Sequence, residues 1–278
     1  MERGDDAMKQ YLAGKIRNVA LAGHSSSGKT TLAEALLYKT GYSDRLGKVA
    51  DGNTVCDFDP EEIKRKVSVS STVAPFAWGS TKINLIDTPG LFDFEGGMYE
   101  GMIAAESALI TVSARDGVEV GTEKAYELAD RLGRAKMFFV TQMDMDHADF
   151  YKVLEQLKAT FGPSVCPLVV PIMEDKKVVC YVDLIHMKAY RYEGGKASEV
   201  PVPQTDHRID GLIAAISEAV AETDEELFEK FFSGEQFTHE ELAKGLHEGI
   251  KSGSLTPVFC GSAQTLEAID LLLDGIAD

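Results

Sequence analysis

GHSSSGKT, at residues 23–30, is the stretch of this sequence that decides the fold. It matches the pattern G-x-x-x-x-G-K-[ST] in full, follows a short apolar run at residues 16–22, and opens a segment with helical spacing at residues 30–40. A glycine-rich turn between a strand and a helix directs backbone N–H groups at phosphate oxygens, and the helix N-terminus favours negative charge there. An ordinary serine-glycine turn would not need the complete motif in this context. The sequence therefore predicts a nucleotide-binding phosphate loop.

The residues of this loop have different expected roles. Gly28 lets the backbone approach the phosphates, Lys29 places its ammonium beside the β- and γ-phosphates, and Thr30 offers a hydroxyl to magnesium. The full set of predicted phosphate-binding residues is Gly23, Ser25, Ser26, Ser27, Gly28, Lys29, Thr30, Thr31 and, from a second motif, Gly90.

Two further motifs follow apolar runs. DTPG, at residues 87–90, places the Asp87 carboxylate at a strand end, where it can bind magnesium through water, and Gly90 can offer a backbone N–H to the γ-phosphate. Alone this motif is an unremarkable turn, but downstream of a phosphate loop it indicates a GTPase. GSA, at residues 261–263, can close a loop against a nucleotide base.

Apolar runs and helical spacing alternate along the chain. The predicted strands are at residues 16–22, 67–78, 82–86, 109–113, 136–140 and 257–260, and the predicted helices at residues 30–40, 98–107, 123–132, 148–160 and 264–276. This alternation predicts an α/β fold of the P-loop NTPase type, with a mostly parallel, doubly wound sheet and helices on both faces.

One interval is too long for a single βαβ step, which takes roughly 30 residues. It runs from Asp144 to Ser262, a span of 118 residues. Its first part reads as a β-meander and its second part, residues 209–250, as acidic helices, so we expect an inserted α+β subdomain. The predicted division assigns residues 1–160 and 255–278 to the nucleotide-binding domain and residues 161–254 to the insert.

Composition narrows the class of protein. The 278 residues are 44% hydrophobic, enough for a proper core, and carry a net charge of −17. Broad nucleic-acid binding by this chain alone is therefore not expected. The four scattered cysteines are typical of buried thiols in a reducing compartment. Neither a signal peptide nor a membrane-spanning run is visible, which predicts a cytoplasmic protein without membrane contact.

These residues resemble the translational GTPases, and closely the G domain of elongation factor G, as a divergent paralogue. The resemblance covers nearly the whole chain from Arg17 and is carried by RNVALAGH, GKTT, LIDTPG, ADFYKVLEQLKATFG, VDLIHMKA and PVFCGSA. It implies binding of GTP, GDP and Mg²⁺, GTP hydrolysis coupled to action on the ribosome, and further domains after Asp278. It also implies that the insert corresponds to the family's extra subdomain and could contact the ribosomal stalk.

The base-recognition motif departs from the family. The family reads guanine with N-K-x-D, and here the strand ends in Thr141, Gln142, Met143 and Asp144. A carboxylate at Asp144 can accept from guanine N1–H and N2–H₂ together, whereas adenine would leave it unpaired, which disfavours an ATP-using enzyme. We expect guanine selectivity with weaker affinity. The residues assigned to the base by resemblance are Thr141, Gln142, Asp144, Ser262 and Ala263.

The motifs near the γ-phosphate also depart from the family. Leu91 stands where the family has a histidine that orients the attacking water, and Ser26 stands where it has an aspartate. The first-switch sequence R-G-I-T-I becomes RKVSV at residues 65–69, in which Ser68 keeps a hydroxyl for magnesium. The expected magnesium residues are thus Thr30, Ser68 and, through water, Asp87. Because Leu91 cannot hydrogen-bond, weak intrinsic hydrolysis is expected. The alternative is a GTP-binding conformational switch with little or no hydrolysis.

Overall fold

The large sheet forms the centre of the molecule. The computed structural model describes residues 10–175, 177–203 and 208–278. The strands of the large sheet are β1 (Ile16–Gly23), β2 (Thr72–Trp78), β3 (Thr81–Asp87), β4 (Ser107–Ser113), β5 (Ala135–Thr141), β6 (Val165–Pro167) and β11 (Thr256–Cys260). Their spatial order is β2-β3-β1-β4-β5-β11-β6. All neighbours run parallel except β2, which is antiparallel to β3.

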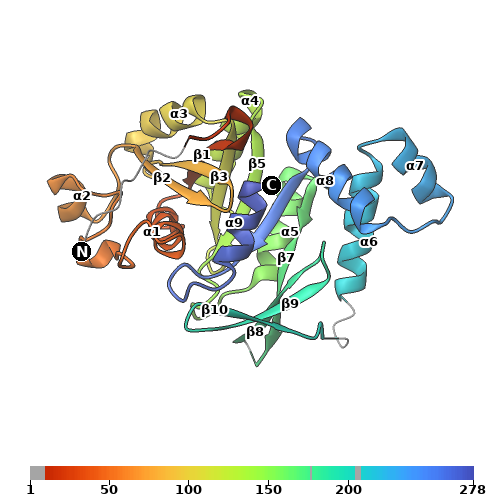
Figure 1. The fold of residues 1–278 in the computed structure, drawn as a ribbon. Coiled ribbons are helices and arrows are strands. Elements are labelled where there is room, and N and C mark those ends of the chain that lie inside the picture. Colours follow the sequence, from red (N-terminus) through yellow and green to blue (C-terminus); the bar gives the residue numbers. More distant parts are fainter. Residues whose placement is uncertain (1–9, 176, 204–207) are drawn as a thin grey trace.

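Helices cover both faces of this sheet. They are α1 (Lys29–Lys39), α3 (Glu95–Ala104), α4 (Val120–Arg131), α5 (Phe150–Phe161) and α9 (Ile269–Ala277). The short helix α2 (Pro60–Arg65) belongs to the connection between α1 and β2, and short 3₁₀ turns occur at Ala13–Lys15, Val49–Asp51 and Phe92–Phe94. Helix α1 packs beside α9, and α3 packs beside α4 (Figure 1). Local sequence sets several helix starts: Asp59 forms a capping box ahead of Pro60, and Asp149 caps α5. The predicted P-loop α/β architecture is confirmed.

A second, antiparallel sheet lies beside the large one. It consists of β7 (Val169–Glu174), β8 (Lys177–Asp183), β9 (Lys188–Glu193) and β10 (Lys196–Val200), in the order β10-β9-β8-β7. Three helices follow it, α6 (Arg208–Ala221), α7 (Glu225–Phe232) and α8 (His239–Ser252), and α6 packs against the other two. Strand β6, although inside the predicted insert, pairs with β11 of the large sheet. The division at residues 161–254 stays a prediction, and residues 165–167 belong to the large sheet.

Two elements begin five residues later than the sequence predicts, the largest differences in element boundaries. The strand predicted over residues 67–78 begins only at Thr72, because the N–H groups of Val69 and Ser70 both donate to the Glu62 carboxylate instead of a neighbouring strand. The helix predicted from residue 264 begins only at Ile269, because the chain first folds back on itself through backbone bonds between Ser262 and Glu267. In both places a side-chain or loop contact replaces regular pairing.

The interior is continuous and apolar. Strands β4, β5 and β11 contribute almost only buried residues, as expected for strands covered on both faces. The four cysteines, Cys56, Cys166, Cys180 and Cys260, are buried free thiols. In the described part of the chain, none of the helices is long and apolar enough to cross a membrane.

Candidate nucleotide-binding site

The loop between β1 and α1 is held by its own side chains. Gly28 precedes α1 with a φ of 88°, a left-handed conformation that suits glycine, and Ser26 adopts a similar φ of 66°. The buried Ser27 hydroxyl donates to the His24 carbonyl at 2.8 Å and contacts the Thr111 hydroxyl at 2.6 Å. Ser26 is exposed, whereas Ser25 and Thr31 are half-buried. These bonds and the two left-handed residues therefore fix the turn that leads from β1 into α1.

Lys29 is the first residue of α1, and its side chain folds back onto this loop. Its ammonium donates to the carbonyl oxygens of Gly23 and His24 at 3.1 and 2.7 Å. Burial lowers the pKa of Lys29 to about 8, although Asp87 and Asp57 act in the opposite direction. Gly90 crosses directly above, since a Cβ at that position would collide with the Lys29 ammonium and come within 3.0 Å of the Ser25 amide nitrogen. The two phosphate-site motifs of the sequence thus meet at Lys29.

A cluster of oxygen atoms adjoins the lysine. The Thr30 hydroxyl donates to Asp87 Oδ2 at 2.8 Å and lies 3.0 Å from the Ser68 hydroxyl, which in turn donates to Asp57 Oδ1 at 2.7 Å. The structure therefore brings together all three predicted magnesium residues and adds Asp57. We refer to these four side chains as the oxygen cluster.

The oxygen cluster fits a small divalent cation. Asp87 is 2% exposed, and its Oδ1 atom is buried without a hydrogen-bond partner among the described residues. Burial raises the pKa of Asp87 to about 7, and burial also raises the pKa of Asp57. Carboxylates and hydroxyls are the hard oxygen donors that magnesium prefers, and a cation would relieve the unpaired buried oxygen.

Buried carboxylates outside the cluster place the segment that carries Asp57 and Ser68. Glu34, on α1, accepts the Val55 N–H at 2.6 Å, and Glu62 accepts the N–H groups just after Ser68. Arg65, in contrast, is exposed and pairs with Glu61. The arginine of the RKVSV segment thus lies outside the site, whereas its serine lies inside.

The end of β5 is fastened to the phosphate loop. Thr141 is 1% exposed, and its hydroxyl donates to the Ser27 carbonyl at 2.7 Å and to the Val112 carbonyl at 3.2 Å. The Gln142 amide donates to the Ser26 carbonyl at 3.1 Å and accepts from the Ser113 hydroxyl at 2.7 Å. The side chains of Thr141 and Gln142, which depart from the family motif, therefore bond to the phosphate loop and to the neighbouring strand β4.

Asp144 and Ser262 meet at the carboxyl ends of β5 and β11. Asp144 is exposed, and its Oδ1 atom accepts from the hydroxyl of the fully buried Ser262 at 2.6 Å. Ala263 is buried beside them. In open α/β sheets, ligands bind outside the carboxyl ends of the strands. The carboxylate is therefore both accessible and oriented.

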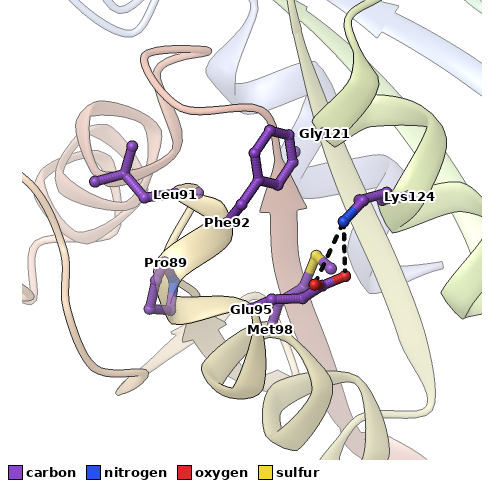
Figure 2. A pocket seen from close by; sticks show the side chains of 9 residues that line it. Pro89, Leu91, Phe92, Glu95, Met98, Gly121 and Lys124 are labelled. Atoms are coloured by element: carbon purple, nitrogen blue, oxygen red, sulfur yellow. Dashed lines mark hydrogen bonds and ion pairs between the residues drawn. The ribbon is translucent and has the colours of Figure 1, made fainter.

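Leu91 contributes no polar atom to the site. It lines a small pocket together with Pro89, Phe92, Gly121 and Lys124, and Figure 2 shows its side chain pointing away from Phe92 and Gly121. Lys124 in the same pocket pairs with Glu95 (Figure 2).

His24 is the imidazole near this pocket, and it already has hydrogen-bonding neighbours. Its Nδ1 atom accepts from the Gly121 N–H at 3.1 Å, and its Nε2 atom lies 3.4 Å from a Glu119 carboxylate oxygen. Its ring also contacts Phe92 edge-on, with 5.8 Å between the ring centroids. The His24 ring is therefore fixed against Phe92 and the start of α4.

Comparison with known proteins now decides the family. The model of the elongation factor Tu GTP binding domain matches residues 14–278. The chain belongs to this family. An elongation factor G-like protein of Thermotoga maritima is 39% identical over 263 residues, which are 95% of this chain and 37% of that protein. A crystal structure of a Thermus thermophilus protein matches with a TM-score of 0.89 and 43% identity, over 95% of this chain and 40% of that one.

Membership in this GTP-binding family confirms the predicted translational GTPase and its elongation factor G-like character. The chain spans about two-fifths of the length of the relatives it matches. The fold, the GTP-binding class and the translation-factor class are thereby settled, while the roles of individual residues stay predictions.

Sequence reasoning missed Asp57 in this site. The aspartate occurs in the stretch VCDFDPEE, where no spacing rule marks it, and of its two apolar neighbours Cys56 is buried whereas Phe58 is exposed. Its link to Ser68 depends on a loop fold that local patterns do not encode.

Proposed function

We propose that this chain is the magnesium-dependent, GTP-binding and GTP-hydrolysing domain of an elongation factor G-like protein that acts on the ribosome in the cytoplasm. The oxygen cluster beside Lys29 and Gly90 is the observation that carries the proposal. This arrangement suits a nucleoside triphosphate with its metal ion. It combines the buried Lys29 ammonium, the backbone of Gly90 close to it, and four side chains whose oxygen atoms can bind a cation. Family membership and the elongation factor G-like relative support the same function.

The phosphates would be held by the loop at residues 23–31, with Lys29 beside the outer phosphates and the Gly90 N–H facing the γ-phosphate. Thr30 and Ser68 would hold magnesium through their hydroxyls, Asp87 would hold it through water, and Asp57 would add a second carboxylate. Bound magnesium would neutralise charge on the phosphate oxygens. The chain itself supplies positioning and electrostatic stabilisation, which are the main contributions in phosphoryl transfer.

Guanine would be read by Asp144, and the Ser262 hydroxyl would orient that carboxylate. The hydrogen bonds of Thr141 and Gln142 support a different role for these two residues than direct base recognition. We assign them to holding the phosphate loop at Ser27 and Ser26, so that base and phosphate sites keep their spacing.

Intrinsic hydrolysis would be slow because Leu91 offers no group to orient water. A polar group from the ribosome, or an arginine supplied in trans, would compensate. The insert is the proposed contact for the ribosomal stalk.

Phosphate release tests the proposal. The full-length protein is measured with GTP, with and without ribosomes, and compared with its Lys29→Ala variant. We expect slow release alone, faster release with ribosomes, and little with the variant. Tight GTP binding without ribosome-stimulated release would instead favour the non-hydrolysing switch, and the absence of GTP binding would overturn the proposal.

A further inference from the structure

The small sheet contacts the loop that begins within the GSA motif and the first turn of α9. We call residues 262–268, between β11 and α9, the base loop. The Tyr181 hydroxyl of β8 donates to Glu267 Oε2 at 3.0 Å, and the Tyr192 hydroxyl of β9 donates to Asp270 Oδ1 at 2.5 Å. Figure 1 places β8, β9 and β10 next to the chain that enters α9. These contacts join parts of the chain separated by more than 70 residues.

The base loop has an unfavourable backbone conformation. Leu266 and Ala268 have φ values of 60° and 59°, in the left-handed region that non-glycine residues rarely adopt. Such residues persist only where their surroundings fix them, and they concentrate at ligand sites. Here the turn between β9 and β10 lies against Leu266, since a Cβ added at Gly195 would come within 3.0 Å of the Leu266 Cβ. Lys39 of α1 ties the same turn down by donating to the Gly195 carbonyl at 2.8 Å.

A short path of hydrogen bonds connects this contact with Asp144. Glu267 exchanges two backbone bonds with Ser262, at 3.1 and 3.0 Å. Ser262 then donates its hydroxyl to Asp144 Oδ1. A shift of Glu267 would therefore move Ser262, and with it the carboxylate.

The Tyr181 phenol is suited to act as a fixed donor in this path. Its side chain is 1% exposed and packs edge-on against Tyr192, with 5.8 Å between the ring centroids. Burial and the nearby carboxylates raise the pKa of Tyr181 well above its ordinary value, so the hydroxyl keeps its proton. Glu267 is thus held on one side by the small sheet and on the other by Ser262.

We propose that Tyr181 is a positioning residue for guanine recognition, through which the small sheet holds the base loop in the conformation that orients Asp144. This rests on the proposed function of Asp144 as the guanine-reading group. Tyr181 does not touch the nucleotide, and its effect is on base selectivity, not on phosphate binding.

Base selectivity provides the test, because inosine lacks the 2-amino group that is one of the two donors to Asp144. Dissociation constants for GDP and IDP are measured in the wild type, in Tyr181→Phe and in the matched control Tyr151→Phe. The control loses a hydroxyl that donates to Pro171 at 3.1 Å, on the far strand of the small sheet. One hydrogen bond to a charged group corresponds to roughly tenfold or more in a binding constant, and only part of that effect should reach Asp144. We therefore expect Tyr181→Phe to weaken GDP binding about threefold to tenfold. IDP binding should weaken less, so that the dissociation constants of GDP and IDP become more alike. The control variant should keep the wild-type ratio of these constants.

A second variant checks the path. Glu267→Ala removes the acceptor, and its effect on the GDP to IDP ratio should not add to that of Tyr181→Phe, because both break one connection. An unchanged ratio in Tyr181→Phe overturns the inference, even if both affinities fall together. If the wild type binds GDP no better than ADP, the proposed function itself fails, and the two failures are thereby distinguished.

Discussion

Replacing Asp57 separates the two contributions that its carboxylate makes to the oxygen cluster. Asp57→Asn keeps an oxygen that can accept the Ser68 hydroxyl, now at 2.7 Å, but removes the negative charge. Asp57→Ala removes both. Asp57 is 5% exposed, so water cannot replace the lost contact freely. A hydrogen bond to a charged group contributes about 1.5–3 kcal/mol, which corresponds to roughly tenfold to a hundredfold in a binding constant.

The assay is GTP binding at increasing magnesium concentration. We expect Asp57→Ala to raise the magnesium concentration for half-maximal GTP binding by about tenfold to a hundredfold, and Asp57→Asn to give a smaller increase. Asp51→Asn is the control, because Asp51 is an exposed carboxylate on the same loop. If Asp57→Ala requires no more magnesium than the control, the oxygen cluster is not the metal site as described.

Three further substitutions test the remaining parts of the site. Asp144→Asn should weaken GTP binding and improve binding of xanthosine triphosphate, whose C2 carbonyl can accept from the new amide. Competition binding measures both affinities, and an unchanged preference for guanine would show that Asp144 does not recognise the base. Lys29→Ala should weaken GDP and GTP alike by about 2–5 kcal/mol, the cost of losing one partner of a buried charge contact, and equal affinity by calorimetry would exclude Lys29 from the phosphate site. Leu91→His should raise the single-turnover rate of GTP hydrolysis with ribosomes, by up to about 10²–10⁴-fold if the imidazole acts as an oriented acid or base, and should leave GTP affinity nearly unchanged. A wild type that already hydrolyses GTP as fast as the variant would show that another residue orients the water.

Much of the fold follows from short segments of sequence. The phosphate loop and the strand and helix on either side of it are specified within about twenty residues, so the motif and its flanks predict the succession of β1, loop and α1 that the structure has. The alternation of apolar runs with helical segments likewise predicts the parallel sheet, because strands buried on both faces are nearly continuous apolar runs.

Contacts between distant segments were beyond sequence reasoning. Asp57 lies on a loop whose backbone N–H groups donate to Glu34 and Glu62, and no periodicity in the sequence encodes these contacts. Thr141 and Gln142 were expected against the base, but their donors face carbonyl groups of the phosphate loop that lie 114 and 116 residues earlier. A motif therefore identifies which residues gather at a site more reliably than it identifies which atoms each one meets.

Nucleotide selectivity in the presence and absence of magnesium tests the central claim most directly. Calorimetric titration of the wild-type protein with GTP, GDP and ATP, each with magnesium and again with excess EDTA, measures the base site and the oxygen cluster together. We expect GTP and GDP to bind much more tightly than ATP, and removal of magnesium to weaken GTP binding. Equal affinity for ATP and GTP, or GTP binding indifferent to EDTA, would contradict that claim.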